Sequence, residues 1–230
     1  MPDPPAVAVL DVNETLADLT GLRGRFEAVG APGHLLEPWF ASTLRDGFAV
    51  TAAGGYVDFR EAAVAALETL LSGVEGLGPP PRAAAERIMA AFADLALHPD
   101  VAPGLVRLRE AGMRLVTLTN GSAELTRALL KRGGVEDLID ERLSVSEVRR
   151  WKPAPEPYAM AAKRCGVSIA DMALIAAHPW DVDGAARAGM RGAWLNRRGV
   201  PYPGFFAPPA VTASDLPALA DALLSSGPAL

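Results

Sequence analysis

Apolar residues along the chain change from a strand-like spacing to a helical one and back again. Residues 6–10 form an uninterrupted, valine-rich apolar run, which is typical of a strand buried on both faces of a parallel sheet. Residues 17–97 instead show helical spacing, with amphipathic stretches at 35–44, 59–71 and 82–97. No convincing strand interrupts them. The pattern therefore predicts a helical subdomain inserted after the first strand.

Strand and helix patterns alternate beyond residue 103. Strands are predicted over 114–119, 143–145, 172–177 and 192–195, and helices over 104–111, 123–132, 155–165, 181–188 and 216–224. This alternation predicts a parallel sheet with helices on both faces, and hence an α/β fold. We expect the core to comprise residues 1–16 and 98–230, and the helical insertion residues 17–97.

Composition and charge indicate a globular protein and argue against some classes of function. Half of the 230 residues are hydrophobic and 21% are charged, as in an ordinary globular protein. The formal net charge of -5 and the lack of a Lys or Arg run argue against a nucleic-acid surface, so an anionic substrate needs local cations. The single cysteine, Cys165, rules out an internal disulfide and fits core packing in a reducing compartment.

The sequence indicates neither a signal segment nor a membrane-spanning one. The first five residues lack a basic region, and no stretch of the chain reaches transmembrane length. We therefore expect a cytoplasmic protein with no membrane partner.

Polar residues follow the predicted strands at several points. They are Asp11 and Thr15, Thr119 and Asn120, Lys152, and the segment 178–183. Because the carboxyl ends of parallel strands meet at one edge of a sheet, these side chains are predicted to converge. A carboxylate held there is a candidate nucleophile. Taken singly, each position also fits a turn or a helix cap, and it is their recurrence that favours a site.

Asp11 is the residue around which this predicted site is arranged. Lys152 is expected to counter its charge and lower its pKa, which keeps the carboxylate ionised in a partly buried cleft. Thr119 and Asn120 are expected to fix the geometry. The alternatives are a solvated loop lysine for Lys152 and a helix N-cap pair for Thr119 and Asn120.

Four segments together resemble the motifs of the haloacid dehalogenase superfamily. They read DVNETL from Asp11, VTLTNG ending at Gly121, WKPAPEPY from Trp151, and AAHPWDVDGA from Ala176. The resemblance spans nearly the whole core, and the order and spacing of the motifs are kept. It implies a Rossmann-like core with a cap subdomain inserted after the first motif.

Within this superfamily the chain is most similar to the type II L-2-haloacid dehalogenases. Tyr158 lies six residues after Lys152, Trp180 directly precedes Asp181, and the helical stretch ends in GYVDF before a new helix. The resemblance implies a homodimeric hydrolase that needs no cofactor and displaces halide from a small anionic 2-haloalkanoate. Asp11 would carry an ester intermediate, and Asp181, with His178, would direct the hydrolytic water.

The predicted substrate contacts come from both regions. They are Asn13, Thr119, Asn120, Tyr158 and Trp180 in the core, and Trp39, Arg45 and Phe59 in the insertion. The family's halide-binding arginine comes two residues after a tryptophan, where this chain has Ala41. Arg45 is our substitute, because residues four apart on a helix share a face. It fits an exposed helix arginine equally well, and the aromatic residues fit plain core packing.

Three positions depart from the dehalogenases and leave the placement of the water open. Asn13, Ala176 and His178 stand where tyrosine, serine and asparagine are usual. The main alternative is a magnesium-dependent phosphatase, which needs acidic residues at Asn13 and Ala177. An amide exchanges no proton near neutral pH, and a missing carboxylate weakens a magnesium site. A non-catalytic binding protein on the same scaffold is a third possibility.

Overall fold

The chain divides into two compact units in this computed structural model, which describes residues 4–225. The core unit comprises the described residues up to Ala17 and from Leu97 onward, and the helical unit comprises Asp18–Ala96. These bounds lie within one residue of the predicted ones.

The core unit contains a six-stranded parallel sheet, which confirms the predicted α/β fold. Its strands, in spatial order, are β5 (Glu141–Ser144), β4 (Arg114–Thr119), β1 (Val7–Leu10), β6 (Met172–Ala176), β7 (Arg191–Leu195) and β8 (Val211–Ala213). Val9 of β1 pairs with Val116 on one side and Leu174 on the other. Asp11 therefore emerges at the middle of the sheet's carboxyl edge.

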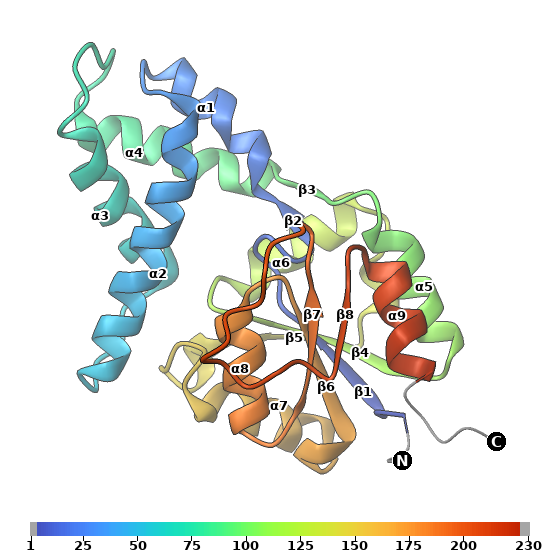
Figure 1. The fold of residues 1–230 in the computed structure, drawn as a ribbon. Coiled ribbons are helices and arrows are strands. Elements are labelled where there is room, and N and C mark those ends of the chain that lie inside the picture. The colour runs from blue at the N-terminus through green and yellow to red at the C-terminus, as the bar shows by residue number, and fades with distance from the viewer. Residues whose placement is uncertain (1–3, 226–230) are drawn as a thin grey trace. The chain divides into compact units, whose positions relative to one another are not determined.

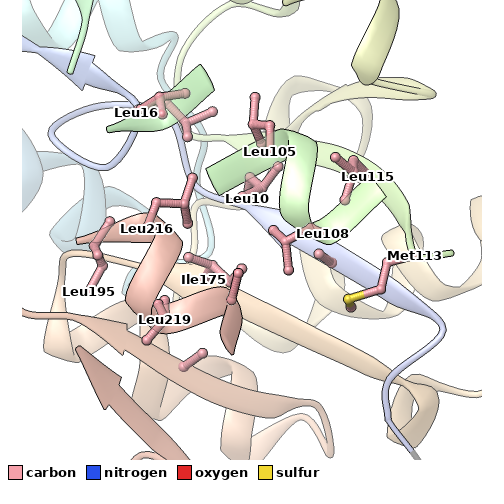
Figure 2. Close-up of a cluster of buried hydrophobic side chains, with 14 of the residues drawn as sticks. Leu10, Leu16, Leu105, Leu108, Met113, Leu115, Ile175, Leu195, Leu216 and Leu219 are labelled. Atoms are coloured by element: carbon pink, nitrogen blue, oxygen red, sulfur yellow. The ribbon is translucent and has the colours of Figure 1, made fainter. Parts of the chain in front are cut away.

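Strand β1 is buried on both faces, as its apolar run predicts. Ala8 and Leu10 belong to one hydrophobic layer, while Val7 and Val9 belong to the other. This alternation follows from the two-residue period of a strand. Figure 2 shows the first layer, in which Leu105 and Leu216 lie around Leu10.

Helices cover both faces of the sheet (Figure 1). The first layer is built with α5 (Val101–Glu110), α6 (Ala123–Arg132) and α9 (Leu216–Ser225), and the second with α7 (Pro155–Cys165) and α8 (Pro179–Arg187). Short 3₁₀ turns lie at Glu136–Leu138, Val145–Glu147 and Ile169–Asp171. Helix α5 packs closely on α9, since a Cβ at Gly104 would lie 2.4 Å from the Leu216 side chain.

The helical unit has a core of its own. Its helices are α1 (Arg23–Ala28), α2 (Leu36–Ala52), α3 (Phe59–Leu71) and α4 (Pro81–Ala90), with 3₁₀ turns at Leu19–Leu22, Gly33–Leu35 and Ala91–Asp94. Trp39 is fully buried, with the Phe26 and Phe92 rings at centroid distances of 6.0 and 6.3 Å. The insertion is thus helical, as predicted.

The chain leaves the core unit and returns to it through two short paired strands. These are β2 (Ala17–Asp18) and β3 (Ala96–Leu97), and the His98 amide donates to the Leu16 carbonyl at 2.9 Å beside them. The helix predicted over 82–97 is therefore too long: α4 ends at Ala90. The backbone of the last residues pairs with β2 instead of continuing the helix.

Within residues 4–225, no helix combines the length and the apolar character that a membrane crossing requires.

Candidate active site

Asp11 lies just beyond β1 and is only 4% exposed. The Thr15 hydroxyl donates to its Oδ2 at 2.6 Å, and the Lys152 ammonium donates to its Oδ1 at 2.9 Å. The Thr15 hydroxyl in turn accepts the Ala177 amide at 2.9 Å, which links the loop after β1 to the end of β6. Both carboxylate oxygens of Asp11 are thus held by donors from other parts of the core unit.

Lys152 is fully buried and bridges two carboxylates. Its Nζ lies 2.5 Å from Asp181 Oδ2 as well as 2.9 Å from Asp11 Oδ1. Asn120 fixes its backbone, because the Asn120 Oδ1 accepts the Lys152 amide at 2.9 Å and the Asn120 Nδ2 donates to the Lys152 carbonyl at 3.3 Å. The structure therefore places Asn120 against Lys152. Thr119, at the end of β4, accepts the Gly121 amide at 2.9 Å and shapes the following turn.

Asp181 lies in the first turn of α8 and is fully buried. The Tyr158 hydroxyl donates to its Oδ1 at 2.5 Å, so both Asp181 oxygens have donors. A Cβ at Gly184 would lie 2.7 Å from the Tyr158 hydroxyl and 2.5 Å from Pro153 Cβ. The absence of a side chain at Gly184 therefore lets Tyr158 reach Asp181.

The electrostatics of this cluster separate its two carboxylates. Burial opposes ionisation of Asp11, but Lys152, His178 and the Thr15 hydroxyl together hold the pKa of Asp11 below its usual value. Burial, with the nearby charge of Asp11, raises the pKa of Asp181 despite Lys152. Burial alone would lower the pKa of Lys152, but the two carboxylates raise it. The Lys152 ammonium therefore stays charged, and its charge favours the ionised form of Asp11.

Tyr158 stays a hydroxyl donor over the physiological range. Burial and the adjacent Asp181 raise the pKa of Tyr158 well above its usual value. A neutral phenol with its hydrogen directed at Asp181 holds that carboxylate toward Lys152.

His178 precedes α8 and lies beside the loop that carries Asp11. Its Nε2 is 3.2 Å from the Asn13 carbonyl oxygen and 3.5 Å from Glu14 Oε2. The ring stacks on Trp180 with centroids 5.1 Å apart. The structure thus brings His178, Trp180 and Asn13 together, and it adds Glu14, which the sequence analysis did not single out.

Arg197 is a second residue that the sequence analysis missed. Its guanidinium donates to the Thr15 carbonyl from Nε at 3.2 Å and from Nη2 at 2.7 Å, and Nη1 lies 2.8 and 2.9 Å from the two Asp100 oxygens. Its position gave a signal, because Arg197 comes two residues after the end of β7, at the same carboxyl edge of the sheet as the other site residues.

A family model for haloacid dehalogenase-like hydrolases matches residues 5–189. The chain belongs to this family of hydrolases. It is 31% identical to (S)-2-haloacid dehalogenase 4A of Burkholderia cepacia over 90% of each chain. It is 29% identical to (S)-2-haloacid dehalogenase 1 of Pseudomonas sp. (strain CBS-3) over 96% of this chain and 98% of the relative. A crystal structure of a dehalogenase with an intermediate complex superposes with a TM-score of 0.86 at 28% identity, over 95% of this chain and 97% of the other.

The phosphatases of this superfamily are expected to bind a magnesium ion at this edge of the sheet. The residues of this chain at that place do not form such a site. The Lys152 ammonium lies between Asp11 and Asp181, and Asn13 and Ala177 supply no carboxylate. Among residues 4–225, no three or more His, Cys, Asp or Glu side chains are grouped to hold a metal.

The helical unit of this hydrolase contains the remaining predicted site residues. Trp39 packs in the core of that unit and donates from Nε1 to the Ala63 carbonyl at 2.9 Å, so core packing accounts for it. The Phe59 ring lies 5.7 Å from that of Phe92. The Arg45 side chain is 71% exposed and pairs with Asp46 at 2.8 Å. Halide binding by Arg45 stays a prediction.

Proposed function

We propose that this hydrolase displaces halide from a short 2-haloalkanoate through an ester on Asp11 and releases a 2-hydroxy acid. The observation that carries the proposal is a buried, ionised Asp11 held by Lys152 and Thr15 at the centre of the sheet edge. Its relatives are named (S)-2-haloacid dehalogenases, which supports the same substrate class here.

In the first step an Asp11 oxygen attacks the carbon that bears the halogen. The new carbon–oxygen bond forms as the carbon–halogen bond breaks, and the halide leaves with the electron pair. Attack from the side opposite the halogen inverts the carbon, so an (S)-2-haloacid gives an (R)-2-hydroxy acid. Halide needs no proton to depart, and a loop with Asn13 in place of an acid therefore suits this step.

In the second step water attacks the Asp11 carbonyl carbon, and the bond between that carbon and the ester oxygen breaks. Negative charge grows on the carboxyl oxygens of Asp11 as the water adds, and the Lys152 ammonium at Oδ1 stabilises it. Both Asp181 oxygens already accept strong hydrogen bonds. We therefore assign Asp181 and Tyr158 to holding Lys152, in place of the predicted water activation and substrate contact.

The other proposed roles follow from where the residues lie. Asn120 positions Lys152, while the half-buried Asn13 and Trp180 are the core residues that we propose for substrate contact. We propose that the reaction uses neither metal nor organic cofactor. A cytoplasmic location and a homodimer remain predictions of the sequence analysis.

A single turnover in heavy-oxygen water tests the covalent step. With enzyme in excess over (S)-2-chloropropionate, one solvent oxygen should enter the peptide that contains Asp11, and the hydroxy acid should carry none. Mass spectrometry of the digest and of the product measures both. Label in the product and none in the peptide would mean that water attacked the substrate directly.

Halide and phosphate release measured side by side, with and without a chelator, separate the competing functions. We expect halide release that the chelator leaves unchanged and that Asp11→Asn abolishes. Chelator-sensitive phosphate release would identify a phosphatase instead. Binding of the haloacid with neither product would identify a binding protein.

A further inference from the structure

Glu14 has a backbone conformation that glycine normally adopts. Its φ is 61°, in the left-handed region, and among residues 4–225 only Arg149 shares this feature outside the glycines. A side chain in that region is unfavourable for an L-amino acid, and such strain concentrates at functional sites. The chain therefore maintains a costly residue three positions after its nucleophile.

In this conformation the Glu14 carboxylate lies beside His178. Glu14 Oε2 lies 3.5 Å from His178 Nε2, and the Asn13 carbonyl oxygen lies 3.2 Å from the same nitrogen. Because a carbonyl can only accept, Nε2 must carry the hydrogen of the neutral ring. Nδ1 is then the basic nitrogen of His178.

The same ring lies against the loop that carries the nucleophile, because its Nε2 contacts the carbonyl oxygen of Asn13, two residues after Asp11. Once the ring has taken up a proton, its positive charge would help to lower the pKa of Asp11. Stacking on Trp180 fixes the plane of the imidazole. The His178 side chain is 14% exposed and that of Glu14 is 40% exposed, so solvent reaches both groups.

We propose that His178 deprotonates the water that hydrolyses the Asp11 ester, and that Glu14 is the positioning residue that holds His178 in the basic tautomer. The inference rests on the proposed function and assigns the base to His178, because Asp181 is fully buried and already bonded to Lys152 and Tyr158. The water gives one proton to Nδ1 while its oxygen bonds to the Asp11 carbonyl carbon. The ester oxygen leaves with its bonding electrons and takes that proton back, and the proton of the regenerated Asp11 carboxyl passes to solvent.

Substitutions at Glu14 separate this role from a structural one. Glu14→Gln removes the charge and keeps the backbone strain, whereas Glu14→Gly removes the side chain and relieves the strain. Rapid quenching with (S)-2-chloropropionate, followed by mass spectrometry of the Asp11 peptide, measures ester formation and ester hydrolysis separately.

Both Glu14 variants should hydrolyse the ester about 10-fold more slowly, and His178→Ala about 100-fold more slowly, with ester formation unchanged. The ester should therefore accumulate on Asp11. Glu14→Gly should at the same time raise Tm by about 2–4 °C, because the left-handed conformation suits glycine. Arg149→Gly, the matched control, should raise Tm similarly and leave ester hydrolysis unchanged.

Ester hydrolysis at the wild-type rate in both Glu14 variants would overturn the assignment. Equal slowing of ester formation and hydrolysis would overturn it too, since a structural defect affects both steps. A wild-type enzyme that forms no ester on Asp11 would overturn the proposed function, and this inference with it.

Discussion

At the scale of single residues, the sequence predicted which side chains at the strand ends lie close together. Asp11, Thr15, Lys152 and Asp181 meet because parallel strands deliver them to one edge. Which partner each side chain chooses was not predictable, because that depends on distances of a few tenths of an ångström between distant segments. Tyr158, predicted to touch substrate, donates to Asp181.

The backbone conformation of Glu14 was also hidden from the sequence. A left-handed φ is signalled when glycine or asparagine occupies the position, and glutamate gives no such signal. In that conformation Glu14 lies 3.5 Å from His178. The residue that we now propose as the positioning group for His178 could therefore be found only from the structure.

Tyr158→Phe separates the two interpretations of this residue. Removing the hydroxyl takes a hydrogen bond from a buried carboxylate, so we expect the free energy of unfolding to fall by about 1.5–3 kcal/mol at pH 7. We also expect kcat to fall and KM to stay unchanged. Urea unfolding and steady-state kinetics measure the three quantities.

Tyr202→Phe is the control, because the Tyr202 hydroxyl donates to the neutral Ala207 carbonyl at 3.0 Å. This substitution should lower the free energy of unfolding by about 1 kcal/mol or less and leave kcat unchanged. A raised KM with unchanged stability in Tyr158→Phe would show that the hydroxyl contacts substrate and not Asp181.

At the scale of elements, the local pattern of apolar residues predicted the bounds of several helices and strands. The bounds predicted for α3, α6, α7 and β4 are those observed, since each has clear periodicity and an end signal such as the Ser122 cap of α6. Helix α5 begins three residues earlier than predicted, because Pro103 is tolerated in a first helical turn.

The elements that were missed depend on tertiary pairing. Strand β8 has three residues, none of them fully buried, and follows a proline-rich loop, so it has no apolar run to reveal it. Strands β2 and β3 have two residues each and exist because they pair with each other. Pairing between distant segments leaves little trace in the local pattern.

Asp100 joins three elements of the core unit and gives a test at this scale. Its carboxylate accepts hydrogen bonds from the Arg197 guanidinium. It also accepts one from the backbone amide of Leu216, the first residue of α9, at 2.7 Å. Burial opposes its ionisation, but these donors hold the pKa of Asp100 below its usual value. We expect Asp100→Asn to lower the free energy of unfolding by about 2–3 kcal/mol at pH 7.

The pH dependence of that loss follows from the direction of the shift. A carboxyl group whose pKa is lowered by folding stabilises the protein at pH values above its pKa in the unfolded chain, which is about 3.9 for aspartate. That contribution is lost as pH falls through the folded value. Urea unfolding at a series of pH values should show the two proteins converging below about pH 4, and a difference independent of pH would contradict the assignment.

A matched control lies elsewhere in the same unit. Glu147 pairs with Arg164 at 3.0 Å on the surface, with both side chains exposed. Glu147→Gln should change the free energy of unfolding by less than about 0.5 kcal/mol at any of these pH values.

At the scale of the whole molecule, the sequence predicted one helical insertion within one α/β core. The insertion begins after Ala17 and ends before Leu97, and each unit has buried side chains of its own. The change from strand to helical periodicity predicted this insertion, because the periodicity of apolar residues depends on which face of an element is buried. The predicted homodimer depends on surfaces that periodicity does not describe, and it stays a prediction.

The paired strands β2 and β3 allow the two units to be separated by design. Neighbouring strands lie about 4.8 Å apart, so a linker of about four Gly and Ser residues can replace residues 19–95 between them. We expect the shortened chain to unfold in one cooperative urea transition, because both hydrophobic layers of the sheet come from the core unit. It should release no halide if the helical unit supplies the halide-binding group.

Far-UV and near-UV circular dichroism measured through the same transition provide the readout. Coincident curves would show that the parallel sheet and its packed aromatic side chains are lost together. The same deletion combined with Leu10→Asp is the control, since a charge in the buried layer should abolish the transition. A shortened chain without near-UV signal or cooperativity would mean that the sheet needs the helical unit to fold, although the buried layers belong to the core alone.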